Sequence, residues 1–212
     1  MDLENISNFN DVSDLMYIFV AILTVDVVVL FLARFYKTGG KYLNEWYDQF
    51  NILAVIVDVM VIFIGFLIAR YLYTAFFADK FGWNPVFFML LLIVVQVIHD
   101  GLFYIGIIRN VPSGSNEMID VFKKYAEDLG GVIYGGDALL VIGSALLAMC
   151  YKKMPTTAFI AVGSVVVYTL PYILFTKNPY VALIEKQVKE AKQKEAEKKP
   201  AFEKIDAYNR LL

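Results

Sequence analysis

Residues 51–77 read NILAVIVDVMVIFIGFLIARYLYTAFF, and only Asp58 and Arg70 carry a formal charge in this run. An α-helix needs about 20 mainly apolar residues to cross the hydrocarbon core of a bilayer, because each residue adds about 1.5 Å along the helix axis. The run exceeds that length. It therefore predicts a transmembrane helix, and it decides the fold class of the chain.

Four further apolar runs have the same length and character: 15–36, 85–108, 132–151 and 156–176. Pro171 removes one amide donor near the end of the last run and predicts a bend there. Hydrophobic residues make up 59% of the 212 residues and the mean hydropathy is +0.59, which is too apolar for a soluble domain. The sequence thus predicts an all-α polytopic membrane helical bundle of about five transmembrane helices within residues 15–176.

The charges that flank the spans differ between the two sides of the expected membrane. Residues 1–14 form a short acidic segment with four acids and no Lys or Arg. The side of the C-terminal tail carries Arg34, Lys37, Lys41, Arg109, Lys123, Lys124 and Lys177. The other side carries Arg70, Lys80, Lys152 and Lys153. Because positive residues favour the cytoplasmic side, we expect an outer or lumenal N-terminus and a cytoplasmic tail.

Aromatic residues are concentrated in two connections between the predicted spans. The first connection contains Phe35, Tyr36, Tyr42, Trp46, Tyr47 and Phe50. The second contains Tyr71, Tyr73, Phe76, Phe77, Phe81 and Trp83. Aromatic side chains prefer the membrane–water interface, so both groups support the span boundaries. We interpret Tyr47 and Asp48 as part of an interfacial loop.

Residues 115–130 contain apolar side chains at helical spacing: Met118, Ile119, Phe122, Tyr125, Ala126 and Leu129. Ser115 or Asn116 can cap the start of this helix, and Gly130 can end it. The pattern predicts an amphipathic cytoplasmic helix that lies on the membrane or on a partner protein. Four of its side chains are the expected docking residues: Met118, Ile119, Phe122 and Tyr125.

Residues 177–212 predict a charged C-terminal helical tail. Glu185 and Lys189 are four residues apart, a spacing that supports a helix, and Pro200 ends that helix. A second apolar stripe follows and provides further docking candidates: Phe202, Ile205, Tyr208 and Leu211. The tail is therefore interpreted as a docking element, with a solvated and partly disordered tail as the alternative.

Five ionisable residues lie inside the predicted spans: Asp26, Asp58, His99, Asp100 and Asp137. An ionised side chain at the bilayer centre costs about 2.5 kcal/mol or more, so such groups normally face the bundle interior, a partner or water. Three of the acids, Asp58, Asp100 and Asp137, are expected roughly 8 to 13 Å from the cytoplasmic ends of their helices and can form one layer. Arg34 lies nearer the same interface and can reach an acid on its own or a neighbouring helix.

This intramembrane polar cluster has two interpretations. Carboxylates and an imidazole at a common depth are the ingredients of a proton relay or a cation path. The same groups can instead fix the order of the helices by hydrogen bonding to one another. We favour the packing role, because intramembrane hydrogen bonds are common without transport and contribute only about 1 kcal/mol each.

The sequence does not support an enzyme. Residues 134–137, Tyr-Gly-Gly-Asp, match the Gly-x-Gly-Asp element of intramembrane aspartyl proteases poorly, because Tyr134 stands where the first glycine belongs. No phosphate-binding loop, catalytic triad or metal-ligand spacing is found, and we expect neither a cofactor nor a metal. Cys150 is the single cysteine, which excludes an intrachain disulfide. Lysines interleaved with Glu in the tail argue against nucleic-acid binding.

The middle of the chain, from Val97 to Ala148, contains three characteristic sequences. They are His99-Asp100-Gly101-Leu102-Phe103-Tyr104, Asn116-Glu117-Met118-Ile119-Asp120-Val121-Phe122-Lys123-Lys124-Tyr125 and Asp137-Ala138-Leu139. These sequences resemble small multi-pass membrane proteins of nucleocytoplasmic large DNA viruses. The resemblance implies an internal virion membrane derived from host endoplasmic reticulum, with cytoplasmic segments that contact minor capsid proteins.

The residues lead to one expected function and one alternative. The expected function is a structural scaffold in the membrane that anchors protein partners, such as capsid proteins, through segments 115–130 and 177–212. Such a protein is expected to form an oligomer or part of a larger assembly, surrounded by lipid. The alternative is a small proton or cation channel or transporter that uses the intramembrane acids.

Overall fold

The computed structural model describes residues 3–36 and 38–177 and, in the tail, 183, 186–190 and 192–193. The chain divides into two compact units, Met1–Thr176 and Lys177–Leu212. In the second unit, residues 186–190 are helical. The predicted docking stripe of the tail (Phe202, Ile205, Tyr208 and Leu211) lies outside the described residues. All regular structure among the described residues is helical, which confirms the predicted all-α fold.

The first unit contains five long helices: α1 (Asp14–Tyr36), α3 (Ile52–Leu72), α5 (Pro85–Gly106), α7 (Val132–Lys153) and α8 (Thr156–Leu174). Each belongs to a helical stretch that is long and apolar enough to cross a membrane, so the predicted five-span bundle is confirmed for the described part of the chain. α5 starts where predicted because Pro85 occupies its first turn and the Asn84 side chain accepts a hydrogen bond from the Phe87 amide at 3.0 Å.

The second span is longer than expected. After α3 the chain continues as a π-helix, Tyr73–Phe77, and then as α4 (Ala78–Phe81). Tyr73 is buried, donates to the Gly82 carbonyl at 2.8 Å and accepts from the Asn84 amide at 2.9 Å. The π-helix thus begins at an aromatic side chain that contacts the α4–α5 connection, and π-helical insertions of this kind are frequent at functional sites.

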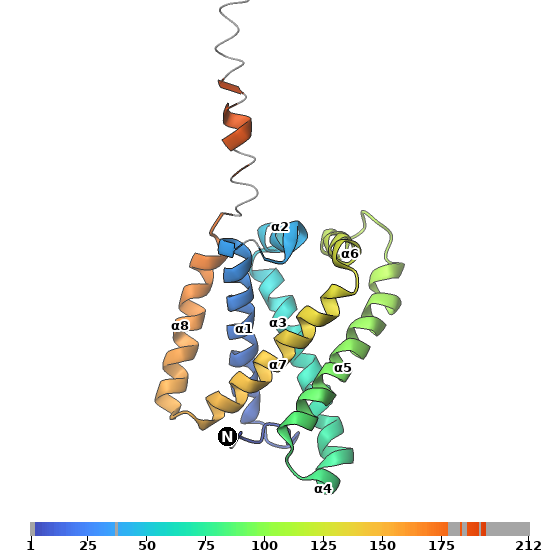
Figure 1. Ribbon diagram of the computed structural model, residues 1–212, viewed down its shortest axis with the longest axis vertical. Helices are drawn as coiled ribbons and strands as arrows, with labels where there is room; N and C mark the ends of the chain where they lie inside the picture. Colours follow the sequence, from blue (N-terminus) through green and yellow to red (C-terminus); the bar gives the residue numbers. More distant parts are fainter. Residues whose placement is uncertain (1–2, 37, 178–182, 184–185, 191, 194–212) are drawn as a thin grey trace, which may run out of the picture. The chain divides into compact units, whose positions relative to one another are not determined.

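α1 lies at the centre of the bundle and contacts α3, α7 and α8 (Figure 1). Two glycines of neighbouring helices face it at distances that leave room for an ordinary van der Waals contact. A Cβ atom at Gly143 of α7 would lie 3.7 Å from Val25, and one at Gly163 of α8 would lie 3.5 Å from Val20. Small residues of this kind allow the van der Waals contact that holds transmembrane helices together.

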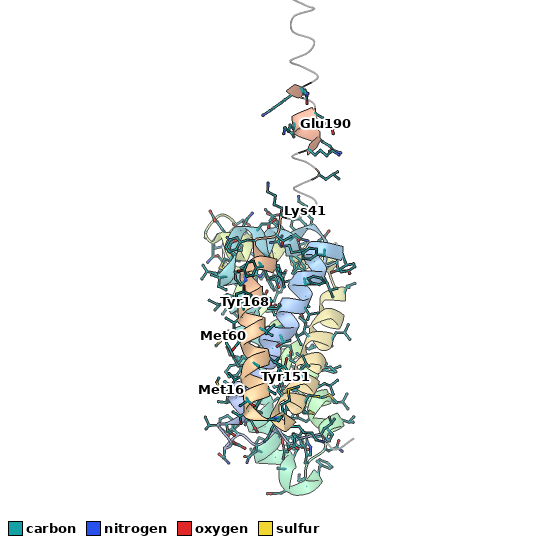
Figure 2. All side chains as sticks on the ribbon, turned by 90° about the vertical axis from the view of Figure 1, so that its left-hand side faces the viewer. Met16, Lys41, Met60, Tyr151, Tyr168 and Glu190 are labelled. Atoms are coloured by element: carbon teal, nitrogen blue, oxygen red, sulfur yellow. The ribbon has the colours of Figure 1, made fainter. Side chains whose placement is uncertain are left out.

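The outer surface of the bundle is apolar along its height. Met16, Met60 and Tyr168 are exposed there, at different levels between the two ends (Figure 2). Exposed apolar side chains of this size on several long helices suit contact with lipid tails. This surface is consistent with an integral membrane protein.

The N-terminal segment is ordered by contacts with two basic side chains, which the sequence did not predict. We call residues 3–14 the N-terminal clasp. Arg70, which is fully buried on α3, donates to the carbonyls of Asn8 and Asp11 and lies 3.6 Å from the Asp14 carboxylate. Lys152 of α7 lies 2.6 Å from Asp14 and donates to the Asn5 carbonyl at 2.7 Å.

The clasp also contacts the α3–α5 side of the bundle. The Thr74 hydroxyl donates to the Ser7 carbonyl at 3.0 Å, and the Trp83 indole donates to the Leu3 carbonyl at 2.8 Å. The clasp therefore connects α1, α3, the α4–α5 connection and α7 at the end of the bundle where the chain begins (Figure 1).

Two short helices lie side by side across the opposite end of the bundle (Figure 1). They are α2 (Gly40–Phe50) and α6 (Glu117–Leu129), and together we call them the platform. α6 lies inside the predicted range 115–130, and Asn116 caps it by accepting from the Ile119 amide at 3.1 Å. A short 3-10 helix, Ile108–Asn110, precedes it after α5.

The interpretation of the first connection as an interfacial loop was wrong. Tyr47 and Asp48 lie on α2, whose buried side chains Asn44, Trp46 and Tyr47 face the bundle. Leu43, Trp46, Tyr47 and Phe50 recur at helical spacing, so the aromatic group is one face of an amphipathic helix as well as an interfacial belt.

Candidate functional site: acids beneath the platform

The structure brings together the intramembrane acids of four helices. Asp26 of α1, Asp58 of α3, Asp100 of α5 and Asp137 of α7 all lie in the half of the bundle next to the platform. Asp137 interacts electrostatically with Asp100 and Asp58, and Asp26 interacts with Asp58. The acids therefore form one connected group, and their transport or packing role stays a prediction.

α2 supplies the hydrogen-bond donors for two of these acids. The Tyr47 hydroxyl donates to Asp26 Oδ1 at 3.1 Å, and the Trp46 indole donates to Asp58 Oδ2 at 3.1 Å. Burial, followed by the charges of Asp26 and Asp58, raises the pKa of the Tyr47 hydroxyl well above its usual value. Tyr47 therefore keeps its proton and acts as a donor in this site.

α6 contributes Tyr125 to the same group. Burial, and then the charges of Asp137 and Asp58, raise the pKa of Tyr125 to about 12. The structure places Tyr125 near these acids, and its expected contact with a partner stays a prediction. Of the other predicted docking residues, Met118 packs against the hydrophobic core, while Ile119 and Phe122 are half-buried. Their docking role stays a prediction.

Arg34 fixes the platform to the bundle. Its guanidinium lies 2.7 Å from the Asp48 carboxylate and donates to Asn44 Oδ1 at 3.1 Å and to the Leu174 carbonyl at 3.3 Å. The acidic partner that was expected for Arg34 on its own or a neighbouring helix is thus Asp48 of α2. Asp26, on the same helix as Arg34, is bound by Tyr47. One side chain of α1 therefore connects α2 with the end of α8.

Asp100 is bound by its own helix. Gln96 Nε2 donates to both carboxylate oxygens of Asp100 at 2.9 Å, and His99 Nδ1 lies 3.1 Å from Oδ1. The imidazole stacks on Phe103 with the two rings 3° from parallel. His99 therefore pairs with its neighbour on α5, and its ring lies over an aromatic side chain of the same helix.

Gly65 of α3 makes room for Gln96, and Gly65→Ala tests this contact. A Cβ atom at position 65 would lie 2.4 Å from Gln96 Oε1, so the buried amide would have to shift, which strains its hydrogen bonds to Asp100. We expect this variant to unfold with a free energy about 1 to 3 kcal/mol lower than that of the wild type, in a detergent titration followed by circular dichroism. Gly101→Ala, where the added atom meets open space, is the control. An equal loss of unfolding free energy in Gly65→Ala and Gly101→Ala would show that Gly65 does not make room for Gln96.

The sequence missed three polar side chains of this site: Trp46, Tyr47 and Gln96. Trp46 and Tyr47 were assigned to an interfacial belt, although their spacing on an amphipathic helix would have placed them against the bundle. Gln96 is the single side-chain amide in the predicted span 85–108, and an amide in a membrane helix needs a partner.

The described part of the chain contains no group of three or more His, Cys, Asp or Glu side chains that could hold a metal ion. The chemistry that this arrangement offers is hydrogen bonding and proton exchange between carboxyl groups and tyrosine hydroxyls. Comparison of the sequence and the structure with protein-family models, curated proteins and solved structures finds no match.

Proposed function

We propose that this protein is a structural scaffold of a membrane whose platform binds a partner protein and couples it to the bilayer. The observation that carries the proposal is the fixed attachment of α2. Arg34, Asp26 and Asp58 each hold a side chain of this helix through a polar contact, and α6 packs along it. A helix that only rested on the membrane surface would not need these buried contacts.

The exposed face of the platform is polar and mainly acidic. Its exposed polar side chains are Lys41, Asp48, Gln49, Glu117, Lys124, Glu127 and Asp128. A partner with a basic surface complements this face. The resemblance of residues 97–148 to viral membrane proteins makes a minor capsid protein the partner to test first, in the internal membrane of a virion. The charge distribution favours a cytoplasmic platform.

A proton or cation transporter is the second candidate, and the acids next to the platform favour it. The contacts at the opposite end of the bundle favour the scaffold function. There the clasp binds Arg70 and Lys152 and connects four segments of the chain. Proton flux into liposomes under a pH gradient distinguishes the two functions. A flux that Asp58→Asn abolishes would support transport and replace the scaffold proposal.

Addition of positive charge to the platform tests the proposed scaffold function. We expect the double variant Gln49→Lys/Glu127→Lys to bind a basic partner about tenfold more weakly, because adding positive charge opposes a positive surface. Both side chains are exposed, so the change costs little folding energy. The measurement is quantitative mass spectrometry of proteins that co-purify from the native source in gentle detergent.

Two further variants act as controls. Asp79→Lys adds positive charge at the exposed α4, at the other end of the bundle, and is expected to leave partner binding unchanged. A chain that ends at Thr176 measures the share of binding that depends on the tail. Undiminished binding by the platform variant and by the shortened chain together would contradict the proposal.

A further inference from the structure

One carboxylate oxygen of Asp26 is buried without a hydrogen-bond partner. Asp26 is 5% exposed, its Oδ1 accepts from Tyr47, and its Oδ2 is buried without any donor. A buried carboxylate oxygen without a donor is costly, and the cost is smaller when the carboxyl group carries a proton and is neutral. The orphaned oxygen therefore indicates a bound proton rather than an ionised group.

A second carboxyl group faces the first. Asp58 of α3 interacts electrostatically with Asp26, and its Oδ2 accepts from Trp46 at 3.1 Å. Among the described residues, no Lys, Arg or His forms an ion pair with either acid. Two close carboxylates in a site of low dielectric and without a cation cannot both be ionised, so the pair retains one proton.

Tyr47 connects the two acids. It is 1% exposed, donates its hydrogen to Asp26 and also interacts with Asp58. A tyrosine hydroxyl has one hydrogen to donate and can also accept. When it donates to Asp26, its oxygen is able to accept from a protonated Asp58. One proton can therefore lie on either acid, and without it both acids are negatively charged.

We propose that Asp26, Tyr47 and Asp58 form a proton-binding site in which the two carboxyl groups share one proton, and that loss of this proton releases α2 from the bundle. The proton leaves from the pair to water, and the pair then carries two negative charges. Asp58 is half-buried whereas Asp26 is buried, so Asp58 is the more accessible of the two acids. The site exists whether or not the platform binds a partner.

Other titratable groups surround the pair on the helices packed against it. Those on the neighbouring helices are Asp137 of α7, Asp100 and His99 of α5, Tyr125 of α6 and Arg34 of α1, which is bound to Asp48. α8 contributes Tyr168 and Tyr172, both exposed. Asp137 adds negative charge close to Asp58, which favours retention of the shared proton.

The direction of the pH dependence follows from the number of bound protons. The state with α2 docked holds one more proton than a state in which α2 has left and water reaches both acids. Docking is therefore favoured as the pH falls, and it weakens as the pH rises through the value at which the pair releases its proton.

Trp46 reports on this equilibrium, because its indole donates to Asp58. The chain has two tryptophans, so Trp83→Phe leaves Trp46 as the single tryptophan, whose fluorescence is excited selectively. We expect the fluorescence of this purified protein in detergent to change in one titration step with pH, together with loss of an infrared carbonyl band of a protonated carboxyl group. Asp26→Asn and Asp58→Asn, which are close in shape to the wild type, are each expected to move both signals to lower pH, because the remaining acid no longer faces a second negative charge.

Asp79→Asn, at the other end of the bundle, is the matched control and is expected to keep both signals. If either asparagine variant fails to fold, Tyr47→Phe takes its place and is expected to shift the midpoint of the titration. An unchanged titration in these variants, or the absence from the wild type of a protonated carboxyl band that persists to higher pH than the bands of exposed acids, would overturn the proposal. The assay uses no partner protein, so its result is independent of the scaffold function.

Discussion

Replacing Arg70 by methionine is expected to reduce the free energy of unfolding by about 3 kcal/mol, since removal of one partner of a buried ion pair leaves the other without compensation. Arg70 is fully buried and donates to the carbonyls of Asn8 and Asp11. The Asp14 carboxylate would keep only Lys152 as a charged partner. The clasp should then detach from the bundle.

Two measurements check this prediction. The free energy of unfolding is obtained from a detergent titration followed by circular dichroism, and the exposure of the clasp from limited proteolysis of residues 3–14. Arg109→Met, at an exposed position after α5, is the control for the loss of one positive charge. Equal stability of the two variants and an uncleaved clasp would show that Arg70 does not hold the N-terminal segment.

Arg34→Met is expected to have the second largest effect, a loss of about 2 kcal/mol, which is below the cost of a fully buried pair because the Asp48 side chain is 34% exposed. The variant also loses hydrogen bonds to Asn44 and to the Leu174 carbonyl. We expect α2 to lose protection from hydrogen exchange while the long helices keep theirs.

Lys41→Met provides the comparison for Arg34→Met. Lys41 is an exposed side chain of α2 whose ammonium group lies over the Tyr42 ring at 5.3 Å, and it has no part in the attachment to α1. Its replacement should leave the protection of α2 unchanged. If α2 is protected from hydrogen exchange as strongly in Arg34→Met as in Lys41→Met, Arg34 does not attach α2 to the bundle.

The spans were predictable because a membrane crossing depends on length and hydropathy, which are properties of a local stretch such as 51–77. The amphipathic helix α6 was predictable for a similar reason, since its period and its Asn116 cap are local. The bounds of the five long helices accordingly fall close to the expected limits, except where the second span continues as a π-helix and α4 to Phe81.

The contacts between distant residues were not predictable in the same way. Arg70 and Lys152 were counted as charges that flank spans, and nothing local indicates that both bind the acidic segment near Asp14. The aromatic residues of α2 have two explanations in sequence, an interfacial belt or a buried helix face, and only the packed structure distinguishes them. The acids of the site were predictable because a charged residue in an apolar span is identified from the local sequence alone.

The clasp also constrains the order in which the protein is assembled. Its partner Arg70 lies in the second span, whereas Lys152 lies at the end of the fourth span and is synthesised much later. Membrane segments are inserted in the order of their synthesis, so the contact between the clasp and Lys152 forms only after that fourth helix has been inserted. Completion of the clasp is thus a late step in biogenesis, one that depends on the correct topology of every span before it.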